Sequence, residues 1–519
     1  MTLLALLACA DPPPPAKTAP NILVVSLDTV RADRLSVYGA PRDTTPNLAR
    51  LAQAGVVFEN AFSSGNESAY SHATLFTGRY ASEVALPVYE TYGVPEDATL
   101  IPEVLRLYNY RTAAFVAGGH VSEGFGFNQG YDFFRSEIGF ASFWDTAPRA
   151  LDWLTEQPAD DKPWFLFLHS YDAHRPYMKP GPWNHLYAKA PGTEIAEKIT
   201  ATSNLSELVV DGHYFPEVTP SYFWHPSGEL IMSTDTYAAV RAARAEREGL
   251  DVTDADRTHV QDHYDGSIAY ADLLLGAFLA DAEDRGLLEN TVVIVFSDHG
   301  EDLLDHGYMN HRTGLYDTCT RVPTIVAGPG FTAGTRAAGL VDTLDIAPTV
   351  FAIAGATPPA GLPGRDLRAI ASGADPGPEA VFSEGVMDMV SVRTATHRLV
   401  YENAPLADST YADTLAAAPL DGTHFQLFDL TADPGELRDL LADLPAGAVP
   451  PPEAAALRDR LVAWRRTLST GTHILPQDQV DPAVAEELRK HGYWAATANE
   501  TAPGATPGAG AKAPPPPPR

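Results

Sequence analysis

Continuous apolar, β-branched runs recur along the chain, and segments with helical periodicity separate them. The runs predict buried strands at 21–28, 112–117, 164–168, 291–297 and 322–327. The periodic segments predict helices near 45–54, 99–108, 146–156 and 255–286. Strands that alternate with helices form βαβ units, so the pattern predicts an α/β fold with a large, mostly parallel sheet covered on both faces.

Two regions depart from this alternation. Residues from about 180 to 253 are rich in Tyr, Trp, His and Pro, which indicates an insertion suited to substrate selection. Short strand-like segments after residue 376 and a predicted helix near 452–468 indicate a small C-terminal α+β subdomain with an antiparallel sheet. We therefore predict a large domain at 21–375, the subdomain at 376–470, and an extension at 471–519 that ends in a disordered Ala/Pro-rich tail.

The first twenty residues have the features of an export signal. An apolar run from Met1 ends in Leu-Leu-Ala-Cys9, which resembles the lipobox of bacterial lipoproteins, although the run is short and has no basic residues before it. A Pro-rich spacer follows at 11–20. We predict that 1–20 is a lipoprotein signal and linker, and that a lipid on Cys9 anchors the protein in the periplasm or at the cell surface. The alternative is that the match is accidental.

Charge and cysteine content exclude several classes of function. Lys and Arg number 36 against 67 Asp and Glu, which gives a net charge of -31. This balance argues against a nucleic-acid partner, because phosphate binding needs basic stripes. A small anionic ligand in a locally positive pocket remains compatible with it. The only cysteines are Cys9 and Cys319, so no disulfide framework exists, and we expect Cys319 to be a buried, inert thiol.

Acidic residues and a histidine follow two of the predicted strands. Asp28 follows the strand at 21–27, and Asp298 and His299 follow the strand at 291–296. In open α/β sheets the carboxyl ends of parallel strands carry the chemistry, so we expect these side chains to meet. Two carboxylates and an imidazole can hold a divalent cation, whereas burying them without one would be costly. For either aspartate alone, a helix N-cap remains the alternative.

A longer series of motifs resembles the sulfatase family of the alkaline-phosphatase superfamily. The series runs in order from about residue 20 to about 440 and comprises Leu27-Asp-Thr-Val-Arg-Ala-Asp33, Thr44-Thr-Pro-Asn47, Leu75-Phe-Thr-Gly78, Tyr171-Asp-Ala-His-Arg-Pro-Tyr177, Ser297-Asp-His-Gly-Glu301, Leu315-Tyr-Asp317 with Arg321-Val-Pro323, Asp345-Ile-Ala-Pro-Thr349 and Phe428-Asp-Leu430 with Asp433-Pro434. The resemblance implies an alkaline-phosphatase-like α/β/α sandwich and the hydrolysis of sulfuric esters.

The resemblance also implies that Asp28, Asp298 and His299 bind one divalent metal ion, with Ca²⁺ as the first expectation. Thr29 stands where the family usually has a second Asp, which removes one charged oxygen. A ligand set with fewer carboxylates and one imidazole is less typical of calcium, so Mn²⁺, Mg²⁺ and Zn²⁺ remain alternative metals.

The nucleophile of the family lies ten residues before the Gly of a Leu-x-Thr-Gly motif, within Cys/Ser-x-Pro-x-Arg, and is oxidised to formylglycine. Counting back from Gly78 gives Ser68. Tyr70 and His72 replace the Pro and the Arg that maturation enzymes read, so we expect Ser68 to stay unmodified and to be activated by the metal. A helix N-cap is the alternative role for Ser68.

The resemblance assigns further residues to the ester group. His174 matches a family histidine that faces the anionic ester or the leaving group, where an imidazole can act as general acid. His311 and Arg312 both lie where the family has a Lys or His that clamps the ester oxygens, and we favour His311. Arg312 and His72 are then expected to contact the substrate. Arg31 either lies near the nucleophile or pairs with Asp33.

Three functions remain open at this point. The first is metal-dependent hydrolysis of a small-molecule or glycan sulfate ester. The second is hydrolysis of a phosphate or phosphonate ester by unmodified Ser68, with Asp172 and either His174 or His311 as candidate ligands of a second metal. The third is a non-catalytic lipoprotein that binds such esters. We expect no nucleic-acid partner and membrane contact only through Cys9.

Overall fold

The computed structural model describes residues 19–84, 93–158, 160, 162–201, 209–210, 213–214, 253–306, 309–312, 314–385, 389–402, 411–442, 444–445 and 448–468. The predicted signal with Cys9, most of the predicted insertion, and the predicted C-terminal extension at 471–519 lie outside the described residues. These expectations therefore stay predictions.

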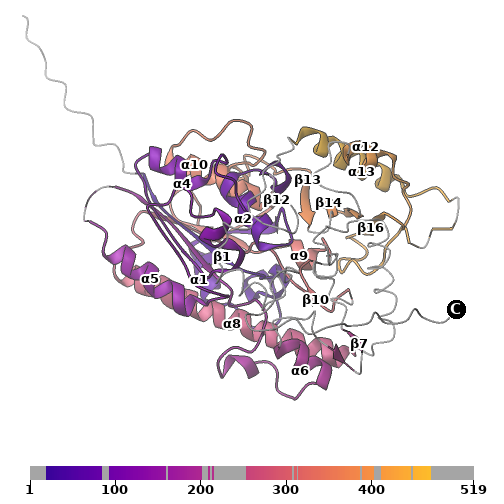
Figure 1. The fold of residues 1–519 in the computed structure, drawn as a ribbon, viewed down its shortest axis with the longest axis horizontal. Coiled ribbons are helices and arrows are strands. Elements are labelled where there is room, and N and C mark those ends of the chain that lie inside the picture. The colour runs from indigo at the N-terminus through magenta and orange to yellow at the C-terminus, as the bar shows by residue number, and fades with distance from the viewer. Residues whose placement is uncertain are drawn as a thin grey trace, which may run out of the picture.

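An eight-stranded sheet forms the centre of the molecule (Figure 1). Its spatial order is β12 (Thr335–Asp342), β2 (Gly55–Phe62), β11 (Thr324–Ala327), β8 (Thr291–Phe296), β1 (Asn21–Leu27), β5 (Trp164–Ser170), β3 (Arg111–Val116) and β4 (Phe133–Ser136). Only β11 runs antiparallel to its neighbours, and all other pairs in this sheet are parallel. The predicted mostly parallel sheet is confirmed.

Helices cover both faces of this sheet, because successive side chains of each buried strand enter two different cores. In β1, Ile22 and Val24 join one core, whereas Leu23 and Val25 join the other. The first core also contains side chains of α2 (Ser68–Thr77), α4 (Ile101–Leu107), α10 (Ile346–Ala354) and α11 (Leu367–Ala371). The second contains side chains of α1 (Pro46–Ala54), α5 (Phe143–Thr155) and α8 (Asp254–Asp284).

The longest helix, α8, lies beside α5 along one face of the sheet (Figure 1). Its N-terminal half also packs against α6 (Glu194–Ala201), which belongs to the start of the predicted insertion. Within the described parts of the chain, no helix combines the length and apolar character needed to span a bilayer.

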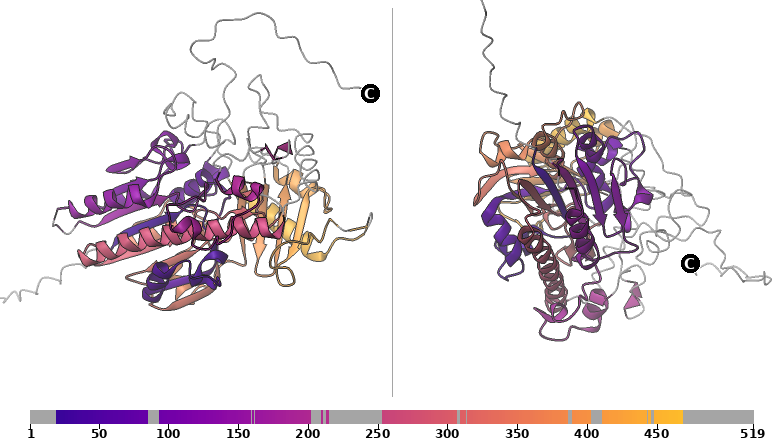
Figure 2. Two further views of the ribbon diagram at one scale, coloured as in Figure 1. Left: turned by 90° about the horizontal axis from the view of Figure 1, so that it is seen from below. Right: turned by 90° about the vertical axis from the view of Figure 1, so that its left-hand side faces the viewer.

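A smaller antiparallel sheet lies beyond one end of the large sheet (Figure 2). It consists of β13 (Ala380–Gly385), β14 (Met389–Thr394), β15 (His397–Glu402) and β16 (Phe425–Asp429). The helix α13 (Pro452–Thr467) packs on β14 and β15 and on α12 (Tyr411–Ala417). The predicted antiparallel sheet is confirmed. One set of its apolar side chains, including Val390 and Leu399, joins the first core of the large sheet, whereas Met389, Val400 and Phe428 form a smaller cluster with Leu315 and Tyr316.

The remaining described elements are short. They are α3 (Ala81–Val84), α9 (Asp317–Thr320), the strand pairs β6 (Val209–Val210) with β7 (His213–Tyr214) and β9 (Asp302–Leu303) with β10 (Met309–Asn310), and 3₁₀ turns at Ala32–Arg34, Ser36–Tyr38, Gly119–Val121, Glu123–Phe125, Trp183–His185 and Thr343–Asp345. Cys319 is buried in α9, as we expected.

A buried ion network joins the antiparallel sheet to α9. Arg398 of β15 is only 1% exposed and pairs with Asp317, and its Nε lies 2.7 Å from Glu436 Oε1. Asp317 also accepts hydrogen bonds from Arg393 at 3.0 and 3.1 Å. Charges buried in this way are tolerated only while each keeps its partner.

We expect Arg398→Met to lower the free energy of unfolding by about 3 to 5 kcal/mol, because Glu436 would remain buried without its cation. Denaturant titration followed by intrinsic fluorescence measures this change. Arg460→Met is the matched control, since its pair with Glu379 is exposed and such pairs contribute little. Equal losses in the two variants would show that the buried network does not stabilise the protein.

Candidate active site

The three predicted metal ligands lie together at the carboxyl ends of β1 and β8. These strands are parallel neighbours, with Ser26 opposite Phe296, so the residues that follow them emerge at the same edge. Asp28, Asp298 and His299 each offer one ligand atom, and these atoms all lie within 4.8 Å of one another. All three side chains are buried.

The donor atoms of this cluster lack the partners that buried carboxylates need. Asp28 Oδ1 and Asp298 Oδ2 are fully buried, and neither accepts a hydrogen bond from the described part of the chain. Burial and the charge of Asp298 raise the pKa of Asp28 well above its ordinary value. A divalent cation would satisfy both orphaned oxygens and offset the repulsion. The residues therefore fit the metal that the sequence predicts.

The orientation of His299 also suits a metal ligand. Its Nδ1 lies 2.9 Å from the carbonyl oxygen of Gly300, and a carbonyl can only accept, so Nδ1 carries the proton. The lone pair is then on Nε2, which lies 3.4 Å from Asp298 Oδ2. Metal-binding histidines commonly donate a hydrogen bond from the ring nitrogen that does not bind the metal, and this bond fixes the tautomer.

The backbone at Thr29 connects the two carboxylates of the metal cluster. Thr29 adopts a left-handed conformation with φ of 60° directly after Asp28. Its amide donates to Asp298 Oδ1 at 3.2 Å, and its hydroxyl donates to the Asp28 carbonyl at 2.7 Å. The side chain that replaces the second aspartate of the family is therefore engaged with the backbone.

Ser68 lies within reach of the cluster. Its hydroxyl donates to Asp28 Oδ2 at 2.9 Å and lies 3.3 Å from His299 Nε2. The N-cap of α2 is Glu67, whose carboxylate accepts from the Ala69 amide at 2.9 Å. The alternative that Ser68 caps this helix is therefore wrong, because Glu67 has that role and Ser68 is the first helical residue.

His72 lies one turn further along α2 and below Ser68. Its Nδ1 donates to the Ser68 carbonyl at 2.8 Å, so its Nε2 accepts from Ser26 Oγ at 3.0 Å. Burial lowers the pKa of His72, so the ring is neutral. It packs among aromatic side chains such as Phe167. Since both nitrogens have partners in the protein, this geometry corrects our expectation that His72 contacts substrate and favours a positioning role.

His311 and His174 form a row that extends from the metal cluster. The ring of His311 lies 4.2 Å from that of His299, and the ring of His174 lies 5.8 Å from that of His311, between centroids. His311 Nδ1 lies 3.1 Å from Glu301 Oε1, and His174 Nδ1 lies 2.8 Å from the Arg175 carbonyl. Burial and the nearby His299 and Arg312 lower the pKa of His311 well below its ordinary value, so this imidazole is neutral.

The Arg312 side chain lies at the start of α2, whereas that of its neighbour His311 lies beside the metal cluster. It is buried, and its Nη2 lies 3.2 Å from Glu67 Oε1. The same carboxylate oxygen lies 2.5 Å from His120 Nδ1. The sequence left open whether His311 or Arg312 contacts the ester. In the structure both lie in the site: His311 lies beside the metal cluster, and Arg312 lies beside Glu67, the residue before Ser68.

Glu67 and His120 are the two members of this site that the sequence reasoning missed. His120 belongs to a 3₁₀ turn that follows β3, and β3 ends at the same edge of the sheet as β1 and β8. Because His120 closely follows that predicted strand, the sequence could have placed it at the edge of the sheet that carries the site. Glu67 had a simpler signal, its place directly before Ser68.

Two other candidates have structural partners. Asp172 accepts from Ser142, Ser170 and the Phe143 amide, which ties the end of β5 to the start of α5. This arrangement gives Asp172 no place in a second metal site. Arg31 pairs with Asp33 at 2.7 Å and with Asp305 at 2.6 Å, which is the second of the two roles we considered for it.

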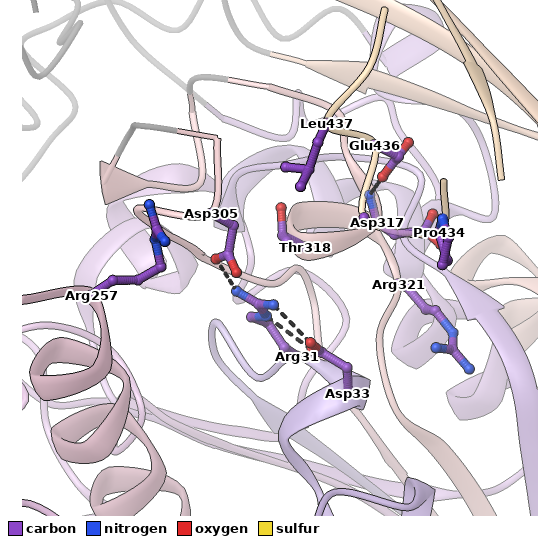
Figure 3. A pocket seen from close by; sticks show the side chains of 11 residues that line it. Arg31, Asp33, Arg257, Asp305, Asp317, Thr318, Arg321, Pro434, Glu436 and Leu437 are labelled. Atoms are coloured by element: carbon purple, nitrogen blue, oxygen red, sulfur yellow. Dashed lines mark hydrogen bonds and ion pairs between the residues drawn. The ribbon is translucent and has the colours of Figure 1, made fainter. Parts of the chain in front are cut away.

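Arg31 also marks a pocket that is separate from Ser68. The pocket has a volume of about 330 Å³ and lies between the segment after β8, the start of α8 and the C-terminal part of the chain (Figure 3). Its walls include Arg257, Asp317, Thr318 and the segment 434–437. None of the three metal ligands lines it, so this pocket is not the candidate active site.

Comparison with known proteins decides the family. Residues 20–356 match the family model described as sulfatase, and residues 304–462 match a model described as N-sulphoglucosamine sulphohydrolase, C-terminal. The chain belongs to the sulfatase family. It is thus a hydrolase of that family, with a buried cluster at Asp28, Asp298 and His299 that is consistent with the metal site of sulfatases.

Relatives of this sulfatase include enzymes of animals and bacteria. Arylsulfatase K of Bos taurus is 23% identical over 460 residues, which cover 82% of this chain and 79% of the relative. N-acetylglucosamine-6-O-sulfatase of Bacteroides thetaiotaomicron is 23% identical over 419 residues, which cover 71% of this chain and 74% of the relative.

Solved structures confirm the predicted fold of the sulfatase. A protein in complex with its substrate D-glucosamine-2-N,6-O-disulfate superimposes with a TM-score of 0.62 at 19% identity, covering 90% of this chain and 99% of the other. The phosphonate monoester hydrolase of Agrobacterium radiobacter gives 0.60 at 20% identity, covering 87% and 96%. The alkaline-phosphatase-like α/β/α sandwich that the sequence predicts is therefore the fold of this chain.

Proposed function

We propose that this protein hydrolyses sulfuric esters, with Ser68 as the nucleophile beside one divalent cation held by Asp28, Asp298 and His299. The observation that supports it is the position of the Ser68 hydroxyl, 2.9 Å from Asp28 Oδ2 and 3.3 Å from His299 Nε2. When bound, the cation would lower the pKa of the coordinated hydroxyl and polarise the ester. Calcium remains the first expectation for its identity.

The surrounding residues would bind and orient the ester. The N-terminus of α2 carries a partial positive charge next to Ser68, and Arg312 adds a guanidinium whose charge is partly offset by Glu67, so these two groups would attract the anionic oxygens of an ester. His311 is neutral and would act through a hydrogen bond. His72 holds the Ser68 carbonyl and thereby fixes the nucleophile at the start of the helix.

His174 is the proposed general acid. Its Nδ1 proton is donated to the Arg175 carbonyl at 2.8 Å, so the proton for the departing alkoxide would come from Nε2. An imidazole that is held through one nitrogen presents the other in a fixed direction, which is the geometry that a positioned acid needs.

We expect His174→Gln and His311→Gln each to lower kcat for an aryl sulfate by a factor of about 10² to 10⁴, the range typical of a lost general acid or of a lost electrostatic contact. Steady-state hydrolysis of 4-nitrophenyl sulfate measures the change. His397→Gln in β15, whose imidazole bonds the exposed Thr396, is the matched control and should leave kcat unchanged. Full activity in both site variants would remove these two assignments.

Hydrolysis of a phosphonate or phosphate ester by unmodified Ser68 is the second candidate. Tyr70 and His72 replace the residues that maturation enzymes read, and the fold is also that of a phosphonate monoester hydrolase. Parallel assays with 4-nitrophenyl sulfate and 4-nitrophenyl phenylphosphonate would rank the two. The names of relatives that act on N-acetylglucosamine sulfate make a glycan sulfate the preferred natural class.

A binding protein without catalysis is the weakest of the three alternatives. The structure brings Ser68 to within 3.3 Å of two residues of the metal cluster, and a protein that only binds esters has no need of a hydroxyl in that position.

A further inference from the structure

Glu67 places a carboxylate inside the candidate active site, and nothing in the proposed mechanism uses it. Its side chain is completely buried. Oε1 lies 2.5 Å from His120 Nδ1 and 3.2 Å from Arg312 Nη2, and Oε2 accepts from the Ala69 amide at 2.9 Å. The carboxylate thus contacts both groups that would attract an anionic ester, the arginine and the N-terminus of α2.

This carboxylate is ionised. Burial alone would raise the pKa of Glu67, but His120 and Arg312 hold it well below the ordinary value of a glutamate. Glu67 therefore brings a negative charge to the position next to Ser68. Its partners are fixed in the same way, since Arg312 is also buried.

A fixed carboxylate at this position has a different effect on substrates of different charge. It balances the positive charge of Arg312, so less attraction is left for an incoming anion, and it repels that anion directly. Both effects grow in proportion to the charge of the substrate. In a buried site with little water, one additional unit of charge on the substrate changes binding by at least an order of magnitude.

We propose that Glu67 is a specificity-determining residue that restricts the site to esters with a single negative charge. Sulfate monoesters, phosphonate monoesters and phosphate diesters belong to this class, whereas phosphate monoesters carry two charges above their second pKa of about 6. The proposal rests on the proposed function, because it takes Ser68 as the reacting centre. It refines that function by naming the residue that excludes dianions.

Glu67→Gln is the variant that separates charge from structure. The amide oxygen of Gln can take the place of Oε2 and accept from the Ala69 amide, so α2 keeps its cap while the negative charge is lost. The NH2 group of Gln then takes the place of Oε1, so Arg312 loses this acceptor together with the charge. Glu384→Gln is the matched control. Glu384 is also a buried carboxylate that accepts from a helical amide, that of Ser82 at 2.8 Å, but it does so at α3.

The experiment compares kcat/KM at pH 8 for 4-nitrophenyl sulfate, 4-nitrophenyl phenylphosphonate and 4-nitrophenyl phosphate, which share a leaving group. We expect the wild type to prefer the two singly charged esters. In Glu67→Gln the ratio of phosphate monoester to sulfate ester turnover should rise about 10- to 100-fold, and in Glu384→Gln it should not change. A residue that only supported the fold would lower all three rates and leave the ratio as it is.

A pH profile gives a second readout. Wild-type turnover of 4-nitrophenyl phosphate should fall as pH rises through the second pKa of the ester, because the accepted monoanion disappears, and Glu67→Gln should weaken this fall. Where Glu67→Gln has no measurable turnover, dissociation constants of the sulfate and phosphate esters in Ser68→Ala, with and without Glu67→Gln, give the same ratio from binding alone.

Two results would overturn the proposal, and they differ. A wild type that hydrolyses the sulfate ester, combined with a Glu67→Gln ratio within twofold of the wild type, would refute the role of Glu67 and leave the proposed function intact. A metal-loaded wild type that hydrolyses none of the three esters would refute the proposed function and, with it, the role of Glu67.

Discussion

Replacing Ser68 with Ala should reduce the hydrolysis of sulfate esters to background. The other hydroxyls beside the metal cluster, those of Thr29, Ser63 and Ser297, bond to backbone carbonyls, whereas the Ser68 hydroxyl bonds to a ligand carboxylate. The thiol of Cys319 is buried in α9, and burial raises its pKa well above the ordinary value. The loss should appear in kcat and in kcat/KM alike, because the interaction is needed for reaction and not for binding. Initial rates with 4-nitrophenyl sulfate measure it.

Ser71→Ala provides the control for this experiment. Ser71 is a buried serine of the same helix whose hydroxyl lies 3.1 Å from Ser63 Oγ. In the described part of the chain, Ser71 bonds no metal ligand directly, because Ser63 lies between it and the Asp298 carbonyl. We expect this variant to keep most of the wild-type activity. Unchanged turnover in Ser68→Ala would rule out the catalytic role of this residue.

The mass of the peptide that contains Ser68 separates two chemical routes. We expect an unmodified serine, because Tyr70 and His72 stand at the positions that maturation enzymes read. An unmodified serine would favour the second candidate, hydrolysis of a phosphate or phosphonate ester, because a sulfate ester of serine is hard to open whereas water opens a phosphoserine readily. Formylglycine at this position would therefore make our expectation about modification wrong and strengthen the sulfatase assignment.

Replacing Asp298 with Ala should remove the metal as well as the activity. Asp298 contributes one of three clustered ligands, and each wild-type chain should hold one divalent ion, measured by elemental analysis. Chelation of the wild type should abolish turnover, and titration with Ca²⁺, Mn²⁺, Mg²⁺ and Zn²⁺ should restore it, with Ca²⁺ first. The metal should also raise the melting temperature, because it offsets the repulsion between Asp28 and Asp298.

Asp298 has a second function that requires a control. It accepts hydrogen bonds from the amides of Thr29 and His299, so Asp298→Asn, which retains an acceptor, should be measured beside the alanine variant. Asp172→Asn serves as the matched carboxylate control and should keep its metal, since Asp172 is bonded to Ser142 and Ser170. Equal metal content in the wild type and in both Asp298 variants would refute the site.

The central strands of the large sheet were predictable because they are buried on both faces and therefore apolar throughout. β2, β12 and β4 were missed; β12 and β2 lie at one edge of the sheet and β4 lies at the other. β2 contains Glu59 and Asn60, and the register of β12 shifts between Ala337 and Leu340, so neither shows a continuous apolar run. The hydrophobic pattern of a single segment does not identify a strand that contains polar residues or that pairs through an irregular register.

The metal cluster was predictable for a related reason. Asp28, Asp298 and His299 each follow a recognisable strand, and parallel strands that lie side by side end at one edge. The predicted strand at 112–117 indicated which edge of the sheet His120 lies at, but its contact with Glu67 depends on tertiary packing that the sequence pattern does not show. The orientation of His72 required the phase of α2, in which four residues turn a side chain by slightly more than one full turn.

The shared hydrophobic core also makes the folding of the large sheet depend on the C-terminal part of the chain. Val390 and Leu399 of the antiparallel sheet and Leu461 of α13 belong to the same core as Ile22 of the first strand. A nascent chain that ends before these residues leaves apolar surface of the large sheet uncovered, and such surface attracts chaperones and promotes aggregation. The large sheet therefore completes its core only when the C-terminal sheet is present, and we expect the two sheets to unfold as one cooperative unit.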